Sequence, residues 1–168
     1  MKILITGSSG FIGTHLALAL LKRGDEVVGI DNHNEYYEPK IKEDRLSLLA
    51  SHNNFKFYFG DIVEKNLINK IFQDFKPEIV VNLAAEVGVR NSIINPDKYI
   101  VTNVSGFGVI LEMCLLHQVQ HLVYASSSSV YGENKETPYS VEQQTDFPMS
   151  LYAVTKKCNE LMAYSYGS

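Results

Sequence analysis

Met1-Lys-Ile-Leu-Ile-Thr-Gly-Ser-Ser-Gly-Phe-Ile-Gly13 opens the chain, and this stretch decides the fold. Residues 3–5 form a short apolar run with β-branched side chains, which predicts a buried strand. The apolar spacing over residues 11–21 predicts a helix, and glycine recurs at every third position between the two elements. A strand, a glycine turn and a helix in this order present free backbone N–H groups and the positive end of a helix dipole to a phosphate.

The three glycines can each be given a physical role. Gly7 would allow the tight turn, Gly10 would let the backbone approach a pyrophosphate, and Gly13 would let the helix pack close to the strand. The spacing is Gly-x-x-Gly-x-x-Gly rather than the commoner Gly-x-Gly-x-x-Gly, and a lone triplet also suits a plain turn in an α/β protein. A dinucleotide site therefore needs support from elsewhere in the chain.

Strand and helix patterns alternate along the rest of the chain. This alternation predicts an α/β fold of the Rossmann type, a doubly wound parallel sheet with strand order 3-2-1-4-5. Ligands bind at the carboxyl ends of such strands, where the order reverses. We expect strands at residues 3–5, 26–30, 55–59, 79–83 and 121–125, helices at 11–21, 39–50, 64–75, 96–117 and 150–164, with Ser150 as a cap, and a loop at 133–149.

Composition narrows the classes of protein. The chain has 168 residues, 45% of them apolar, which suits one domain with a substantial core. A formal charge of −4 without a basic stripe argues against a nucleic-acid partner. Cys114 and Cys158 form no Cys-x-x-Cys pair, so we expect reduced thiols and a cytoplasmic protein. The turn at residues 6–10 interrupts any signal sequence, and no window approaches the ~18 apolar residues of a membrane span. We expect no metal.

Acidic and small residues end the strands on the expected cofactor side. Asp31 ends the second strand, about 20 residues after the glycine turn, where a carboxylate bonds a ribose 2′-hydroxyl and disfavours a 2′-phosphate. This position favours NAD over NADP, although a turn aspartate would look the same. Asp61 could accept from an adenine amino group or cap a turn after Gly60. Leu83-Ala84-Ala85 leaves room for a flat ligand or for a closely packed helix.

Tyr152 and Lys156 share one face of the expected last helix. An ammonium beside a phenol favours the phenolate, which can act as a general base on a sugar hydroxyl. Tyr36 and Lys40 have the same spacing but follow no hydroxyl cluster, so we expect them at the surface. The run Ser126–Ser129 follows the fifth strand and supplies hydroxyls at the switch point, or simply a polar strand end.

Together these motifs resemble the extended short-chain dehydrogenase/reductases, in the NAD-dependent epimerase/dehydratase family, over essentially the whole chain. In order they are Thr6-Gly-Ser-Ser-Gly-Phe-Ile-Gly13, Gly60-Asp61, Leu83-Ala-Ala85, Ser127-Ser-Ser-Val-Tyr-Gly132 and Tyr152-x-x-x-Lys156. Further stretches look like UDP-glucuronate 4-epimerases, namely Val27-Val-Gly-Ile-Asp-Asn32, Asn34-Glu-Tyr-Tyr37, Ala85-Glu-Val-Gly-Val-Arg90 and Tyr152-Ala-Val-Thr-Lys-Lys157.

The resemblance implies an NAD-dependent epimerisation at C4 of a UDP-sugar, UDP-glucuronate to UDP-galacturonate, through transient oxidation. Ser127, Tyr152 and Lys156 would be catalytic, and Arg90 with Ser127–Ser129 would bind substrate, Ser128 and Ser129 by donating to the carboxylate. The helices at 96–117 and 150–166 would form a homodimer. The residues implied to contact NAD are Gly7, Ser9, Gly10, Phe11, Ile12, Gly13, Asp31, Asn32, Asp61, Ile62, Leu83, Ala84, Ala85, Asn103, Tyr152 and Lys156.

Two departures from the family pattern bear on these expectations. Asn82 stands where members often carry histidine. Relatives are much longer, so we expect residues 1–168 to be an NAD-binding domain truncated before the last sheet strands and a C-terminal nucleotide-sugar-binding domain, and inactive alone. An epimerase, decarboxylase or dehydratase for another UDP- or dTDP-sugar stays open. So does an inert module for NAD binding or dimerisation.

Overall fold

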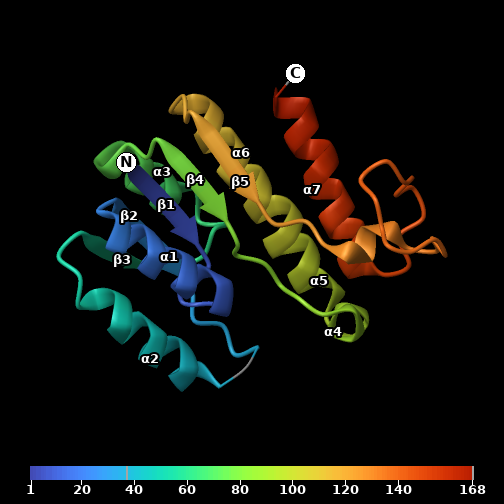
Figure 1. Ribbon diagram of the computed structural model, residues 1–168, viewed down its shortest axis with the longest axis horizontal. Coiled ribbons are helices and arrows are strands. Elements are labelled where there is room, and N and C mark those ends of the chain that lie inside the picture. The colour runs from blue at the N-terminus through green and yellow to red at the C-terminus, as the bar shows by residue number, and fades with distance from the viewer. Residues whose placement is uncertain (37, 168) are drawn as a thin grey trace.

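A computed structural model describes residues 1–36 and 38–167. Tyr37, which ends the quoted stretch from Asn34, and Ser168 lie outside the described residues. Five parallel strands form one sheet in the order β3-β2-β1-β4-β5, which confirms the predicted topology (Figure 1). The strands are β1 (Lys2–Thr6), β2 (Glu26–Asp31), β3 (Phe55–Phe59), β4 (Ile79–Asn82) and β5 (His121–Tyr124).

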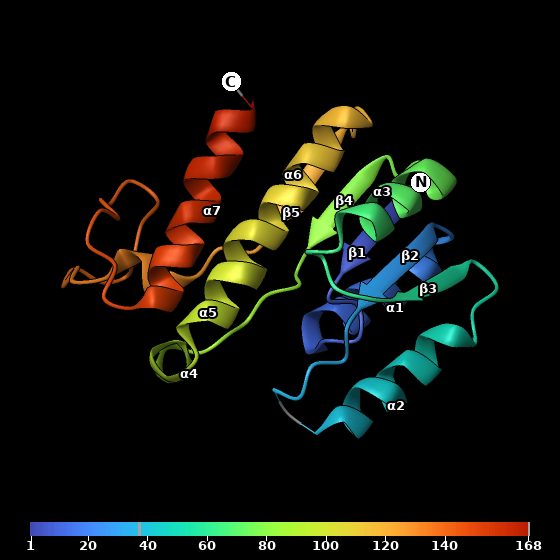
Figure 2. The ribbon, with the colours of Figure 1, turned by 180° about the vertical axis from the view of Figure 1, so that it is seen from behind.

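Helices cover both faces of the sheet. Helices α1 (Phe11–Arg23) and α2 (Pro39–Ala50) lie on one face, and α3 (Lys65–Phe75) and α6 (Phe107–Leu116) lie on the other (Figures 1 and 2). Because side chains alternate along a strand, β1 serves two cores. Leu4 packs with residues of α3 and α6, whereas Ile3 and Ile5 pack with residues of α1.

The helix predicted over residues 96–117 is interrupted by a π-helical segment. It runs as α5 (Pro96–Tyr99), the π-helix η1 (Ile100–Gly106) and α6. Such π segments often occur at functional sites. Pro96–Leu116 is also long and apolar enough to cross a membrane, which the sequence pattern did not predict. Because α6 buries Phe107 and Ile110 among other core residues, this length and composition are weak evidence for a span.

Two short helices were not predicted. Helix α4 (Val89–Ile94) begins after Gly88, and the 3₁₀-helix η2 covers Ser128–Tyr131. Both are too short to show a hydrophobic period in the sequence. The last helix, α7 (Leu151–Gly167), lies beside α6 in both views (Figures 1 and 2) and runs three residues past the predicted end. Ser150 Oγ accepts from the N–H of Ala153 at 3.1 Å, which confirms the predicted cap.

Candidate functional site

The turn after β1 requires glycine at two of its three positions. Gly7 has φ +69°, and a Cβ there would lie 2.8 Å from the backbone N of Ala84. A Cβ at Gly13 would lie 2.2 Å from the carbonyl oxygen of Gly7, so the helix can approach the turn only without a side chain. Among the described residues no side chain caps α1, and its first turn holds no acidic residue. Its free N–H groups are therefore open to an anion.

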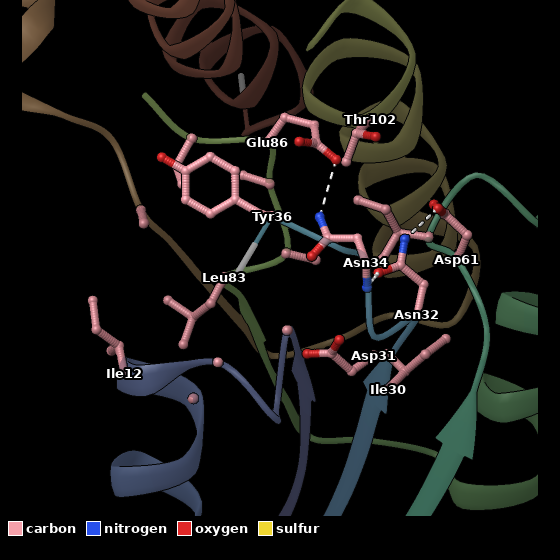
Figure 3. Close-up of a pocket in the computed structure, with 18 of the residues that line it drawn as sticks. Ile12, Ile30, Asp31, Asn32, Asn34, Tyr36, Asp61, Leu83, Glu86 and Thr102 are labelled. Carbon is pink, nitrogen blue, oxygen red and sulfur yellow. Dashed lines mark hydrogen bonds between the residues drawn. The ribbon is translucent and has the colours of Figure 1, made fainter. Parts of the chain in front are cut away.

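A cavity of about 410 Å³ opens at the carboxyl ends of the strands and brings both expected halves of the site together (Figure 3). It is lined by the glycine turn on one side and by Tyr152 and Lys156 on the other. This volume is in the range of small-molecule sites. The predicted residues that line it are Gly7, Gly10, Phe11, Ile12, Gly13, Asp31, Asn32, Asp61, Ile62, Leu83, Ala84, Ala85, Tyr152 and Lys156.

Asp31 is held by a lysine that the sequence did not reveal. Its Oδ1 accepts from Lys42 Nζ at 3.0 Å and from the N–H of His33 at 2.9 Å, and its Oδ2 accepts from the N–H of Ser9 at 3.1 Å. Lys42 and Asp31 are both buried, with side chains 7% and 3% exposed. Since a carboxylate has about four lone-pair sites, Asp31 keeps some capacity for a ribose hydroxyl. Ser9 itself is buried; its N–H binds Asp31, and its Oγ lies 3.0 Å from His33 Nε2.

Neighbouring loops are tied to one another at the same end of the sheet. Asp61 Oδ2 accepts from Asn32 Nδ2 at 2.7 Å, and Asp61 Oδ1 accepts from the N–H of Val63 at 3.1 Å. Asp61 therefore orders the loop after β3 and also fixes the amide of Asn32. The bond to the N–H of Val63 agrees with the turn cap that we anticipated, and Asp61 also lines the cavity, so its contact with an adenine amino group stays a prediction.

The loop after β2 reaches across to the loop after β4. Asn34 Nδ2 donates to Glu86 Oε1 at 3.0 Å (Figure 3). Tyr36, which we expected at the surface, is 44% exposed, and it also lines the cavity. The surface position predicted for Tyr36 is therefore confirmed, and the loop at residues 32–36 brings this exposed side chain to the mouth of the cavity. Lys40 agrees with the same prediction, since its side chain is 72% exposed.

Asn103 lies in the π-helical segment and organises the loop after β4. Its Oδ1 accepts from the N–H of Glu86 at 2.8 Å, and its Nδ2 donates to the carbonyl of Glu86 at 3.0 Å and to Thr155 Oγ1 at 3.0 Å. Asn159 on α7 donates in turn to the carbonyl of Asn103 at 2.6 Å. Asn103 is buried and does not line the cavity, so it joins α7 to the loop rather than facing a ligand.

Tyr152 and Lys156 stand at the β5 end of the cavity. Lys156 Nζ donates to the carbonyl of Ala125 at 3.0 Å, directly after β5. Burial lowers the pKa of the Lys156 ammonium from 10.5 to about 8. The ring of Tyr152 meets the buried ring of Tyr99 edge to face, with centroids 6.2 Å apart. This contact restricts the direction in which the phenol can point.

The serine run divides between the cavity and its rim. Ser126 lines the cavity and donates to Glu160 Oε1 at 2.6 Å, although Ser127 was the expected hydroxyl. Ser127 Oγ accepts from the N–H of Ser129 at 3.2 Å and donates to Ser129 Oγ at 3.2 Å. The residues from Ser127 to Ser129 do not line the cavity, nor does Arg90 on α4. Within residues 1–36 and 38–167, no three His, Cys, Asp or Glu side chains gather as a metal site would require.

Comparisons with known proteins identify the family to which the chain is similar. The model of the family described as GDP-mannose 4,6 dehydratase matches residues 4–168. Protein CapI of Staphylococcus aureus is 52% identical over 99% of the chain, and UDP-glucuronate 4-epimerase 1 of Arabidopsis thaliana is 45% identical over 99% of it. The chain spans only 49% and 39% of these two relatives.

A solved structure extends the likeness to the fold. The UDP-glucuronic acid 4-epimerase from Bacillus cereus, in complex with UDP-glucuronic acid and NAD, superimposes with a TM-score of 0.89 at 35% identity. The match covers 99% of this chain and 52% of that one. The likeness therefore covers the described sheet and all of its helices, but only about half of the known enzyme.

Proposed function

This chain belongs to the family described as GDP-mannose 4,6 dehydratase, and we propose that it is the NAD-binding, N-terminal part of a nucleotide-sugar 4-epimerase. One observation carries the proposal: a single cavity joins an anion-binding glycine turn to a tyrosine and a buried lysine. The relatives include an enzyme named as a UDP-glucuronate 4-epimerase, which is 45% identical to this chain. Residues 1–168 would then be one domain of a longer protein.

The residues present fit a dinucleotide. The N–H groups at the start of α1 would bind the pyrophosphate, and the remaining acceptor capacity of Asp31 would take the ribose hydroxyl. Asp61 and Ile62 would lie beside the adenine, and the small Ala84 and Ala85 would leave room for the nicotinamide. When bound, NAD supplies the acceptor, and later the donor, of the hydride at C4 of the sugar.

Tyr152 would move the proton in this reaction. Its phenolate would take the proton of the C4 hydroxyl while the C4–H bond breaks, and would return that proton after the keto sugar has turned over. The Lys156 ammonium would favour the phenolate and hold the nicotinamide ribose. Ser127 donates to Ser129 Oγ at 3.2 Å, so its hydroxyl would have to turn toward the cavity to donate to the C4 oxygen. Each group ends the cycle in its starting state, as an epimerisation without net redox change requires.

We propose UDP-glucuronate as the substrate. A sugar carboxylate needs donors near C6, and Arg90 with Ser128 and Ser129 would provide them from the rim of the cavity. Among the described residues the hydroxyl of Ser128 makes no hydrogen bond, so it has its donor available. The matches also include epimerases named for uncharged sugars, such as the UDP-glucose 4-epimerase of Bifidobacterium longum, so a neutral UDP-hexose is the second candidate.

We propose further that two copies pair through the helices at 96–117 and 150–166. Seven large side chains along these helices are between 45% and 79% exposed: Ile100, Val101, Leu115, Leu116, Val154, Leu161 and Tyr164. Helices α6 and α7 lie side by side (Figure 2). We therefore expect these exposed side chains to form one apolar face. Light scattering should give the mass of a dimer, and Leu161→Glu should give a monomer.

A turnover assay tests the main proposal. This chain and a longer version, carrying the second half of a close relative, would be incubated with NAD and UDP-glucuronate, and UDP-galacturonate would be measured. We expect NAD binding by both and turnover by the longer protein alone. Turnover by residues 1–168 would contradict the domain assignment. If the longer protein binds NAD but shows no turnover, the result would favour the alternative hypothesis of an inert NAD-binding or dimerisation module.

A further inference from the structure

The strand order places one side-chain contact above the glycine turn. Strands β2 and β4 are the two neighbours of β1, so the loops that follow them stand on either side of the turn from Gly7 to Gly13. The hydrogen bond from Asn34 to Glu86 joins these two loops across the end of β1 (Figure 3). Asn34 and Glu86 line the same cavity as Asp31 and Tyr152, so their bond closes part of the wall around a ligand that extends between those two residues.

A chain of polar contacts fixes the direction of the Asn34 amide. Its Oδ1 accepts from Lys42 Nζ at 2.8 Å, and the same ammonium binds Asp31 at 3.0 Å. With its oxygen held by a cation, Asn34 can turn only its NH₂ group toward Glu86, whose carboxylate is an acceptor. Lys42 is buried with Asp31, so this anchor is sheltered from solvent.

Glu86, the other residue in this hydrogen bond, is anchored through its backbone. Asn103 binds both the N–H and the carbonyl of Glu86, at 2.8 and 3.0 Å, and it also holds Thr155 of α7. The backbone at Glu86 is therefore fixed to the helix that carries Tyr152 and Lys156. To open the cavity at this point, the protein must either break the hydrogen bond between Asn34 and Glu86 or move the loop at residues 32–36.

We propose that Asn34 and Glu86 form a latch that retains the dinucleotide. This inference rests on the proposed function, and it adds a role that the chemistry needs. In a transient oxidation the reduced cofactor must stay in place until it has returned its hydride, because its escape would leave the keto sugar unreduced. A bond between two loops that both line the cavity would slow the exit and the entry of the cofactor alike.

Release of NADH tests the latch without any need for turnover. The protein would be loaded with NADH, chased with excess NAD, and followed by the loss of bound NADH fluorescence; association would be measured separately. Asn34→Asp keeps an oxygen for Lys42 but sets two carboxylates against each other. We expect it to speed release and association alike by about tenfold, with the Kd changed less than about threefold. Glu86→Gln keeps the acceptor with a weaker bond and should give a smaller acceleration.

The pattern of rates separates the possible results. Glu86→Ala combined with Asn34→Asp should be no faster than Glu86→Ala alone, because both remove the same bond. Faster release with unchanged association would show a direct contact with the cofactor and overturn the latch. Unchanged rates would overturn it as well. If the unaltered protein fails to bind NADH, the proposed function fails first, and this result is distinct from the other two.

Discussion

Two buried lysines stand at opposite ends of the cavity, and their partners differ. At the β2 end Lys42 is 3.0 Å from the Asp31 carboxylate, with both side chains buried. At the β5 end Lys156 binds only the carbonyl of Ala125, and in the part of the chain that the structure describes no carboxylate lies within ion-pair distance of it. Lys42 therefore has a fixed charge partner, whereas Lys156 carries its charge at the cost of desolvation.

This difference matches two functions within one cavity. A paired lysine holds a carboxylate and two loops in a fixed geometry, which suits binding. A buried lysine without a carboxylate partner, whose pKa is lowered to about 8, has an uncompensated charge that can act on a reacting group beside it, which suits chemistry. We infer that the β2 end positions a ligand and that the β5 end carries the chemistry. Substitutions at each end of the cavity test this division.

Tyr152→Phe should separate chemistry from binding. In the longer active protein we expect kcat to fall by a factor of about 10² to 10⁴, because a general base is lost, while the Kd for NAD changes only a few-fold. Asp31→Ala should show the opposite pattern, with a larger effect on the Kd for NAD than on kcat. The measurements are steady-state turnover and titration of NADH fluorescence. Equal losses of both quantities in either variant would remove the division between the two ends.

Lys42→Met should destabilise the protein. It leaves the Asp31 carboxylate buried with only two backbone donors, and we expect the free energy of unfolding to drop by about 3 kcal/mol. Lys40→Met is the matched control on the same helix, because Lys40 meets Asp44 with both side chains more than 60% exposed. Urea denaturation should show no clear change for this control. An equal, small effect of both substitutions would mean that Lys42 is not an anchor.

The fold was predictable from the sequence because the glycine turn and the apolar periods all agree on one topology. Helix α4 and the 3₁₀-helix η2 escaped prediction since they contain six and four residues, too few to show a period. The π segment around Asn103 has no sequence signature of its own. Patterns in a single sequence therefore predict the order of strands and helices well, but they do not predict short helices or a π-helical segment.

The candidate site was predictable where a residue ends a strand, and less so elsewhere. Asp31 and Asp61 line the cavity because the carboxyl ends of parallel strands share one edge of the sheet. Lys42 lies in the polar helix α2, where a lysine is expected in solvent, and only the tertiary structure shows its burial. Asn34 and Glu86 meet although they are far apart in the chain, and no local pattern predicts such a contact.

Lys156→Met should alter the pH dependence of stability. Burial lowers the pKa of Lys156 from 10.5 to about 8, so between these values the unfolded chain binds more protons than the folded one. Stability of the unaltered protein should therefore rise with pH across this window, by about 3 kcal/mol at most. The variant should lack this rise and be the more stable protein near pH 7. Urea denaturation at several pH values measures both; parallel curves would show that Lys156 is not desolvated.

Ser128→Ala should have the smallest effect and the most specific one. The Ser128 side chain is exposed at the rim of the β5 end, whereas Ser127 and Ser129 bond to each other at 3.2 Å. A hydroxyl that donates to a carboxylate forms a charge-assisted bond, so its loss should lower kcat/KM for UDP-glucuronate by about tenfold. An uncharged UDP-hexose offers no such acceptor, and its kcat/KM should fall about twofold or less. Equal losses on both sugars would show that Ser128 supports the loop and does not select the charge, and the assignment of glucuronate would then depend on Arg90 and Ser129.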